Sequence, residues 1–465
     1  MSRLRMAGCI LGLLAFSLTL GAPALGYAAG PPDPAQAKTP IQHLVVLMQE
    51  QHSFDNYFGT YPGANGLPAG VCMPLNPLDS SNKDCVKPFH LADTALRAPA
   101  NIRDTFQLQY RAGHMDGFIN AFRQVGKTGT SVMGYYDQAD IQYYWNLANE
   151  YLLFDRFFSA AAAGSVTNHM YWVAGAPGAA NDQLPDTGWG DLPTIFDRLQ
   201  AAGVSWKFYV QNYDASLTYR HREHGPRDTQ IVRVPLLAFD RFIDDPALAG
   251  HIVDLNTYYA DVRNGTLPAV AYIAPLGASE QPPGDVGAGQ RFVKGLVDTL
   301  VKSDAWDSSA FILTYDYWGG WYDHVAPPQV DAYGYGFRVP TLLVSPYVRK
   351  GAIDSTTYDV TSILKFIEDN YGLKPLATRD AQATSIAKAF NFAQAPRVPQ
   401  IISLDPPAGT LAGPRRVVLE LSYGGALVIA ALVIAWAAFG ARFRVRSIYI
   451  RSLSAKLPSR KDGKR

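Results

Sequence analysis

The stretch IQHLVVLMQEQHSFDNYFG, residues 41–59, decides the fold class. Its apolar run at 44–48 predicts a short buried strand, because strands of parallel sheets are nearly continuous in Val and Leu. Carboxylate, amide and imidazole side chains follow this run at once, beginning with Glu50 and Gln51. In open α/β sheets ligands bind beyond the carboxyl ends of the strands, and a buried carboxylate there needs a positive partner such as a divalent cation. The simpler alternative is a strand, a turn and a helix capped by Ser53.

Predicted strands and helices alternate along the rest of the chain. The strands are expected at 204–210, 269–273, 311–315 and 341–344, and the helices at 106–123, 192–202, 290–301 and 362–370. A helix-to-strand transition is expected over 141–153, and the polar stretch 211–265 is expected to form a cap or insertion. This alternation is typical of an α/β fold whose mainly parallel sheet is covered on both faces.

Charge is distributed unevenly along the 465 residues. The whole chain has a net charge of +1, whereas residues 442–465 carry nine Lys and Arg against one Asp and the first 27 residues carry two Arg. The part between them therefore has a net charge of −9. An acidic domain argues against a nucleic-acid-binding protein, which would show a basic surface. With 48% hydrophobic residues, the chain can build a large core in one or two domains.

Two apolar segments predict export and anchoring. Residues 9–20 follow two arginines, as in a cleaved signal peptide, with a membrane anchor as the alternative. Residues 421–441 contain no charge and precede a basic tail, which predicts a transmembrane helix, with a buried core helix as the alternative. The predicted order is a signal peptide (1–29), a large domain (30–390), a Pro- and Ala-rich linker (391–420), the transmembrane helix (421–441) and the tail (442–465). The protein is thus expected at the cell membrane as a single-pass protein, with its domain extracytoplasmic and its C-terminus cytoplasmic.

Two cysteines remain once the predicted signal peptide is removed. Cys72 and Cys85 lie in a stretch rich in Pro, Asn and Ser. In an exported protein such a pair predicts one disulfide, and two free thiols are the alternative.

Further polar residues follow other predicted segments. Asp316 comes directly after the strand at 311–315, and Asp323 and His324 follow shortly after it. Ser165 follows a run of small residues, and at the start of a helix its hydroxyl could act as a nucleophile beside a cation. Thr167 is the second choice for the nucleophile. The alternatives are an ordinary helix cap for Ser165 and a structural turn for the Asp-His pair.

Four segments carry a resemblance to a known family. They are EQHSFDNYFGTYPG (50–63), GSVTNHMYW (164–172), SEQPPGDVGAGQRFV (279–293) and TYDYWGGWYDHVAPP (314–328). The first resembles the ENRSFDxYFG signature of the bacterial phosphoesterase family that includes phospholipases C and acid phosphatases. The second resembles the nucleophile segment of its acid-phosphatase branch. The resemblance covers about residues 40–390 and implies a three-layer, alkaline-phosphatase-like α/β/α sandwich that hydrolyses phosphate esters with a Ser or Thr nucleophile on a divalent metal.

The resemblance also implies roles for individual residues. Glu50 and Asp316 would be metal ligands, and Gln51 and Asp323 are further candidate ligands. Ser165 would be the nucleophile. The supporting catalytic candidates are Asn168, His169 and His324.

Several positions depart from the family pattern. Gln51 stands where the family has Asn, Gln281 where it has His, and Tyr317 where it has a second carboxylate. Asn101 lies near the position of a further family His. Because a neutral phenol is a poor replacement for an anionic oxygen ligand, a weakened metal site is one expectation.

Three functions follow from these observations. The first is a membrane-anchored, acid-phosphatase-like phosphoesterase, acting on small phosphate esters or, as a phospholipase C, on phospholipid head groups. The second is a pseudoenzyme that binds a phosphorylated or cell-envelope ligand. The third is a sulfatase-like or phosphomutase-like transferase on the same fold.

Overall fold

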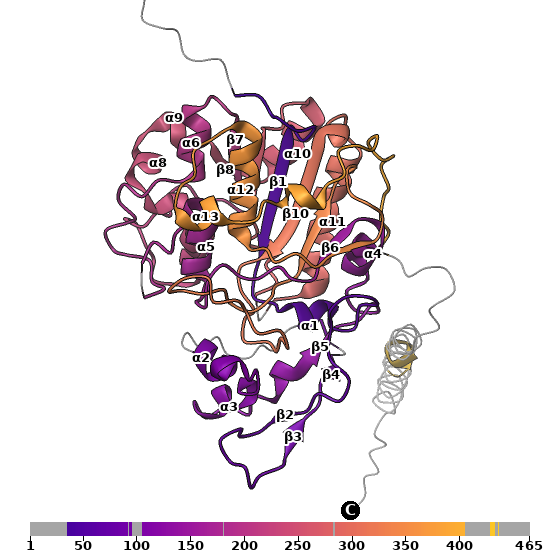
Figure 1. The fold of residues 1–465 in the computed structure, drawn as a ribbon. Coiled ribbons are helices and arrows are strands. Elements are labelled where there is room, and N and C mark those ends of the chain that lie inside the picture. The colour runs from indigo at the N-terminus through magenta and orange to yellow at the C-terminus, as the bar shows by residue number, and fades with distance from the viewer. Residues whose placement is uncertain are drawn as a thin grey trace, which may run out of the picture.

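The fold is built on one eight-stranded sheet (Figure 1). The computed structural model describes residues 35–91, 93–94, 105–179, 181–281, 284–404, 428–432 and 436. The strand order is β12-β6-β11-β10-β1-β9-β7-β8. The strands are β1 (His43–Gln49), β6 (Leu152–Phe154), β7 (Trp206–Val210), β8 (Ile252–Asp254), β9 (Val270–Ala274), β10 (Ser309–Tyr315), β11 (Thr341–Val344) and β12 (Ala352–Asp354).

Most neighbouring strands in this sheet are parallel. Strand β1 lies at its centre, parallel to both β9 and β10, and β7 continues the parallel part. Only β11 runs antiparallel to its neighbours β10 and β6 within the described strands of this sheet. The residues of β1 after His43 and all residues of β9 and β10 are buried, as expected for strands covered on both faces. The predicted mainly parallel α/β sheet is therefore confirmed.

Helices cover both faces of the sheet. Alternate side chains of β7 show this, because Phe208 packs against Trp172 of α5 (Ser165–Ala174) and Tyr209 packs against Tyr258 of α10 (Asn256–Asn264). The other described α-helices outside the lobe are α4 (Gln142–Glu150), α6 (Ile195–Ala201), α7 (Thr229–Arg233), α8 (Asp240–Asp244), α9 (Pro246–Ala249), α11 (Val286–Val301), α12 (Val360–Tyr371) and α13 (Thr378–Gln382). This arrangement is the three-layer sandwich that the sequence predicts.

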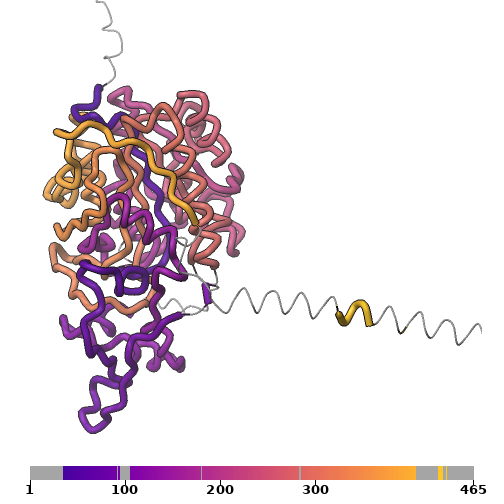
Figure 2. The backbone as a smooth tube through the Cα atoms, turned by 90° about the vertical axis from the view of Figure 1, so that its right-hand side faces the viewer, coloured from indigo at the N-terminus to yellow at the C-terminus, as the bar shows by residue number. Residues whose placement is uncertain are grey.

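A smaller lobe lies beyond the carboxyl end of β1, as Figures 1 and 2 both show. Its elements are α1 (Phe54–Phe58), β2 (Met73–Pro74), β3 (Cys85–Val86), β4 (Phe89–His90), α2 (Thr105–Tyr110), α3 (Phe118–Arg123) and β5 (Gly134–Tyr135). The lobe has its own apolar cluster, to which Tyr317, Trp318 and Tyr322 from the segment after β10 contribute. The lobe is thus attached to the same end of the sheet at which Glu50 and Asp316 lie.

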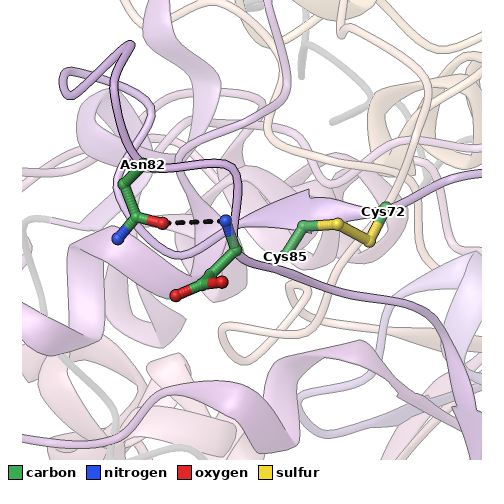
Figure 3. Close-up of a disulfide and its surroundings, with 4 residues drawn as sticks. Cys72, Asn82 and Cys85 are labelled. Carbon is green, nitrogen blue, oxygen red and sulfur yellow. Dashed lines mark hydrogen bonds between the residues drawn. A yellow bond between two sulfur atoms is a disulfide. The ribbon is translucent and has the colours of Figure 1, made fainter.

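The predicted disulfide between Cys72 and Cys85 is confirmed (Figure 3). It links the residue before β2 to the first residue of β3. In the loop between these strands the Asp84 amide donates to Asn82 Oδ1 at 2.8 Å. The bond therefore closes a short local loop in the lobe.

Two predictions of local structure are wrong in part. The expected helix over 106–123 is divided into α2 and α3, because Arg111, Ala112 and Met115 adopt positive φ angles between them. The stretch 211–265 is more than a cap, since its β8 is an edge strand of the main sheet and its α10 packs on β7.

The predicted transmembrane helix over 421–441 is also wrong. Within the described residues, no helix combines the length and apolar character that crossing a bilayer requires. Of this segment the structure describes only 428–432 and 436, and the rest lies outside the described residues. The predicted single-pass membrane location and the membrane partnership through this helix are overturned by the same finding. The predicted signal peptide at 1–29 and the tail at 442–465 lie outside the described residues.

Candidate active site

Two neighbouring strands bring two carboxylates together. Gln49, the last residue of β1, pairs in register with Tyr315, the last residue of β10. The next residues are Glu50 and Asp316, which are 1% exposed each. The Asp316 amide donates to the Gln49 carbonyl at 3.0 Å, so the pairing of the two strands continues to the point where the carboxylates begin.

Asp316 is held firmly by its surroundings. Its Oδ1 accepts hydrogen bonds from the backbone amides of Gln51 at 2.8 Å and Tyr317 at 2.7 Å. Its Oδ2 accepts a hydrogen bond from the Ser165 hydroxyl at 2.6 Å. Burial, and after it the negative charge of Glu50, raise the pKa of the Asp316 carboxyl well above its usual range. A cation at this point would remove that repulsion.

Ser165 is the first residue of α5, which meets the condition on which the sequence makes it a candidate nucleophile. The turn that precedes it is braced by Asn168, whose side chain accepts from the Ala161 amide at 2.9 Å and donates to the carbonyls of Ala163 and Gly164, both at 3.0 Å. Asn168 is buried and is absent from the pocket lining among the described residues. It therefore positions the turn before Ser165 through hydrogen bonds to the backbone.

His169 lies one turn after Ser165 and faces Glu50. Its Nδ1 lies 2.8 Å from the Ser165 carbonyl, an acceptor, so Nδ1 carries a hydrogen and donates it. Its Nε2 lies 3.4 Å from Glu50 Oε1, and Arg233 Nε lies 3.0 Å from the same oxygen. Burial acts to raise the pKa of Glu50, but Arg233 and His169 together hold it below its usual value.

These residues form a candidate metal centre. Glu50, His169 and Asp316 are all buried, and one ligand atom from each lies within 4.8 Å of the others. Glu50 Oε1 has no well-formed hydrogen bond within the described structure, so a buried acceptor remains open toward this centre. Two carboxylates and an imidazole form a donor set that suits a divalent cation. His169 was expected only in a supporting role, and its place in this group is a finding of the structure.

The centre opens into a pocket of about 280 Å³. Its lining residues are Glu50, Gln51, Ser165, Val166, Asp182, Thr229, Val232, Arg233 and Gln281. Gln51 has a φ of +66°, an uncommon conformation for a residue other than Gly, and Gly319 lies so close to its carbonyl that a Cβ would meet that oxygen at 2.4 Å. The turn after β1 is therefore a strained element at the site.

Asp323 and His324 belong to a second cluster. His324 Nδ1 lies 2.7 Å from Asp55 Oδ2, and Arg338 Nε donates to Asp323 Oδ1 at 2.9 Å. Arg338 also donates to Asp55 Oδ1 at 3.0 Å through Nη2 and is fully buried. Neither Asp323 nor His324 lines the pocket within the described structure. Arg338 already pairs with both carboxylates of this cluster. The geometry of the cluster therefore indicates that it joins the lobe to the sheet.

Tyr317 stands at the position for which the sequence resemblance implies a second carboxylate. Its ring lies in the apolar cluster of the lobe, edge-on to Trp318 at 5.3 Å between ring centres. Its hydroxyl is buried without a hydrogen-bond partner among the described residues. The tyrosine thus extends the hydrophobic core of the lobe and adds no anionic group to the candidate metal centre.

Glu280 anchors the loop that carries Gln281. Its buried carboxylate accepts hydrogen bonds from the hydroxyls of Tyr57 and Tyr315, both at 2.6 Å, and from Tyr144. Its amide donates to the Gln49 side chain at 3.2 Å. Burial raises the pKa of Glu280 to about 7, although the three tyrosines lower it in part.

We expect Glu280→Gln to flatten the dependence of stability on pH. The folded-state pKa of about 7 lies above the ordinary value of 4.5, so the folded protein holds a proton that the unfolded chain releases. This contribution to stability is fully present below pH 4.5 and is lost as the pH rises through 7. The difference amounts to about 3 kcal/mol. Urea titrations between about pH 5 and pH 8 should show wild-type stability falling more steeply than that of the variant; parallel curves would contradict the assignment.

Sequence reasoning missed Arg233, Asp182 and Glu280 at this site. Arg233 interrupts the apolar run IVRVPLL at 231–237, and a lone Arg in such a run indicates a buried, paired charge. Asp182 lines the pocket and accepts from the Thr167 amide at 2.8 Å, and no pattern around it predicts this place.

Comparison with known proteins agrees with the four motifs. The profile of the Phosphoesterase family matches residues 41–374. Phospholipase C A of Mycobacterium tuberculosis is 30% identical over 449 residues, which cover 83% of this chain and 84% of the relative. Non-specific phospholipase C1 of Arabidopsis thaliana is 27% identical over 419 residues, and the match covers 78% of this chain and 73% of the relative. The solved structure of a protein in the alkaline phosphatase superfamily from Vibrio parahaemolyticus is 14% identical in sequence. The match covers 75% of this chain and 73% of that chain, and its TM-score of 0.36 supports no argument by itself. The resemblance inferred from the motifs is therefore confirmed.

Proposed function

Since the chain belongs to the Phosphoesterase family and is a hydrolase of phosphate esters, we propose that it cleaves phospholipid head groups with Ser165 as its nucleophile. One observation carries the proposal. The Ser165 hydroxyl donates to Asp316 Oδ2 at 2.6 Å, beside Glu50, in a pocket at the carboxyl ends of β1 and β10. The phospholipase C names of the relatives support the lipid substrate.

The side chains divide the chemistry between them. Ser165 Oγ forms the new bond to phosphorus while the bond to the leaving alcohol breaks, and Asp316 Oδ2 receives the hydroxyl proton along the existing hydrogen bond. The leaving oxygen takes a proton from solvent. Water then hydrolyses the phosphoserine and returns the free hydroxyl.

Glu50, Asp316 and His169 would hold a divalent cation, which supplies charge for the phosphoryl oxygens and lowers the pKa of a nearby hydroxyl. The hydrogen bond from His169 Nδ1 to the Ser165 carbonyl fixes the ring so that Nε2 faces the centre. Asn168 keeps the preceding turn in place.

A second candidate substrate is a small phosphate ester, which the GSVTNHMYW segment favours through its resemblance to the acid-phosphatase branch. The pocket of about 280 Å³ has room for a phosphate and a small leaving group.

The test is hydrolysis by the full chain of phosphatidylcholine in vesicles and of a chromogenic phosphomonoester. Both are measured with EDTA and after Mg²⁺, Mn²⁺, Ca²⁺ or Zn²⁺ is added back. We expect release of phosphocholine that EDTA abolishes and one cation restores. Turnover of the monoester alone would favour the second substrate. Hydrolysis of neither substrate with any cation would favour the pseudoenzyme and overturn the proposal.

A further inference from the structure

Two buried arginines pair with acidic residues, Arg338 with Asp55 and Asp323 and Arg233 with Glu50. They differ in how many of their N–H groups have acceptors. Arg338 donates to Asp323 through Nε and to Asp55 through Nη2. Its Nη1 donates to the carbonyls of Asn65 and Asp155, both at 2.8 Å. Four of its five N–H groups therefore meet oxygen acceptors, as expected for a structural residue.

Arg233 is used less completely. Its Nε faces Glu50 Oε1 at 3.0 Å, Nη1 donates to the Pro275 carbonyl at 2.9 Å, and Nη2 donates to Gln281 Oε1 at 2.5 Å. The contacts of Nη1 and Nη2 are hydrogen bonds, whereas the contact of Nε with Glu50 is an ion pair without hydrogen-bond geometry. One N–H on Nη1 and one on Nη2 therefore have no partner within the described part of the chain. Arg233 is 4% exposed, yet it lines the pocket.

The position of Arg233 follows from helix packing. It lies on α7, which packs against α5, the helix that begins at Ser165. Thr229 is four residues earlier on the same face of α7 and lines the same pocket. Arg233 and Ser165 are therefore brought to one cavity by two helices, and each contacts one of the two paired carboxylates.

We propose that Arg233 is a phosphate-binding residue of this pocket and that Gln281 positions it. The proposal rests on the proposed function and names the group that recognises the phosphoryl oxygens. A phosphate that approaches Glu50 and Asp316 meets two carboxylates, and Tyr317 supplies no further ligand for a cation. A guanidinium with one free N–H on each terminal nitrogen matches two oxygens of a phosphate. Gln281, which replaces the family His, holds the guanidinium by its side-chain oxygen.

The test measures the binding of inorganic phosphate to the full chain by calorimetry, with EDTA and then with each cation. With EDTA present, we expect Arg233→Met to weaken phosphate binding by about tenfold or more, and Arg233→Lys to recover part of the loss because the charge remains but the fork is absent. The matched control is Arg227→Met, which removes an exposed arginine six residues away that pairs with Asp214 and Glu223. The control should bind phosphate as the wild type does.

Equal phosphate affinity in wild type and Arg233→Met would overturn the proposal, as would the absence of phosphate binding in the wild type. Circular dichroism reports whether each variant is folded. If Arg233→Met is unfolded, Gln281→Glu and Gln281→Ala decide, since the first keeps an oxygen acceptor for Arg233 Nη2 and the second removes it. Weaker phosphate binding in Gln281→Ala than in the wild type supports the proposal, and unchanged affinity overturns it. If phosphate binding depends on Arg233 but the protein hydrolyses no ester, the proposed function is wrong and the role of Arg233 stands. If the protein hydrolyses esters but phosphate binding does not depend on Arg233, the role of Arg233 is wrong and the proposed function stands.

Discussion

Ser165→Ala is expected to lower the turnover of phosphate esters by ~10³-fold or more, about 4 kcal/mol of activation free energy. The substitution removes the only hydroxyl side chain that both lines the pocket and bonds to a candidate metal ligand within the described structure. Steady-state kinetics on the preferred substrate measure the loss. Mass spectrometry of the quenched reaction should find one phosphoryl group on Ser165 in the wild type and none in the variant.

Thr167 provides the competing assignment. It is 1% exposed and does not line the pocket among the described residues. Thr167→Val should therefore keep most of the activity, and Ser81→Ala, in the exposed loop of the disulfide hairpin, should keep all of it. If Ser165→Ala is fully active and Thr167→Val is inactive, Thr167 and not Ser165 is the nucleophile.

The sequence was sufficient for those parts of the site that follow a strand directly. The apolar runs before Glu50 and Asp316 predict buried strands, and parallel strands place their carboxyl ends at one edge. Ser165 is a candidate nucleophile on condition that it begins a helix after the small-residue turn, and it is the first residue of α5. These inferences need only local patterns and the general geometry of α/β sheets.

Contacts between distant side chains could not be predicted in this way. The place of Arg233 depends on how α7 packs against α5, and nothing within a few residues of it encodes the partner Glu50. Asp323 carries the same carboxylate as Asp316 and lies seven residues later, yet a buried arginine pairs with it away from the pocket. Charge and spacing identify candidate ligands, whereas packing decides which of them face the cavity.

Arg338 is expected to be the residue whose loss destabilises the protein most among those considered. Its guanidinium is fully buried, lies over the ring of Phe54 at 4.4 Å and faces Asp55 and Asp323. Removing one partner of a buried ion pair leaves uncompensated charge and costs about 3–5 kcal/mol. Arg338→Met, which keeps much of the side-chain volume, should lower the free energy of unfolding by that amount in urea titrations near pH 7.

The expected loss of stability in Arg338→Met depends on the burial of the ion pair, so an exposed arginine serves as the control. Arg220 pairs with Asp240 and Asp244 on the surface, so Arg220→Met should leave the urea midpoint nearly unchanged. Adding Asp323→Asn to Arg338→Met should recover part of the lost stability, because one of the two stranded carboxylates is then neutral. If Arg338→Met lowers the free energy of unfolding by less than about 1 kcal/mol, Asp55 and Asp323 take up protons at little cost. The prediction would then be wrong, and this cluster would not be what joins the lobe to the sheet.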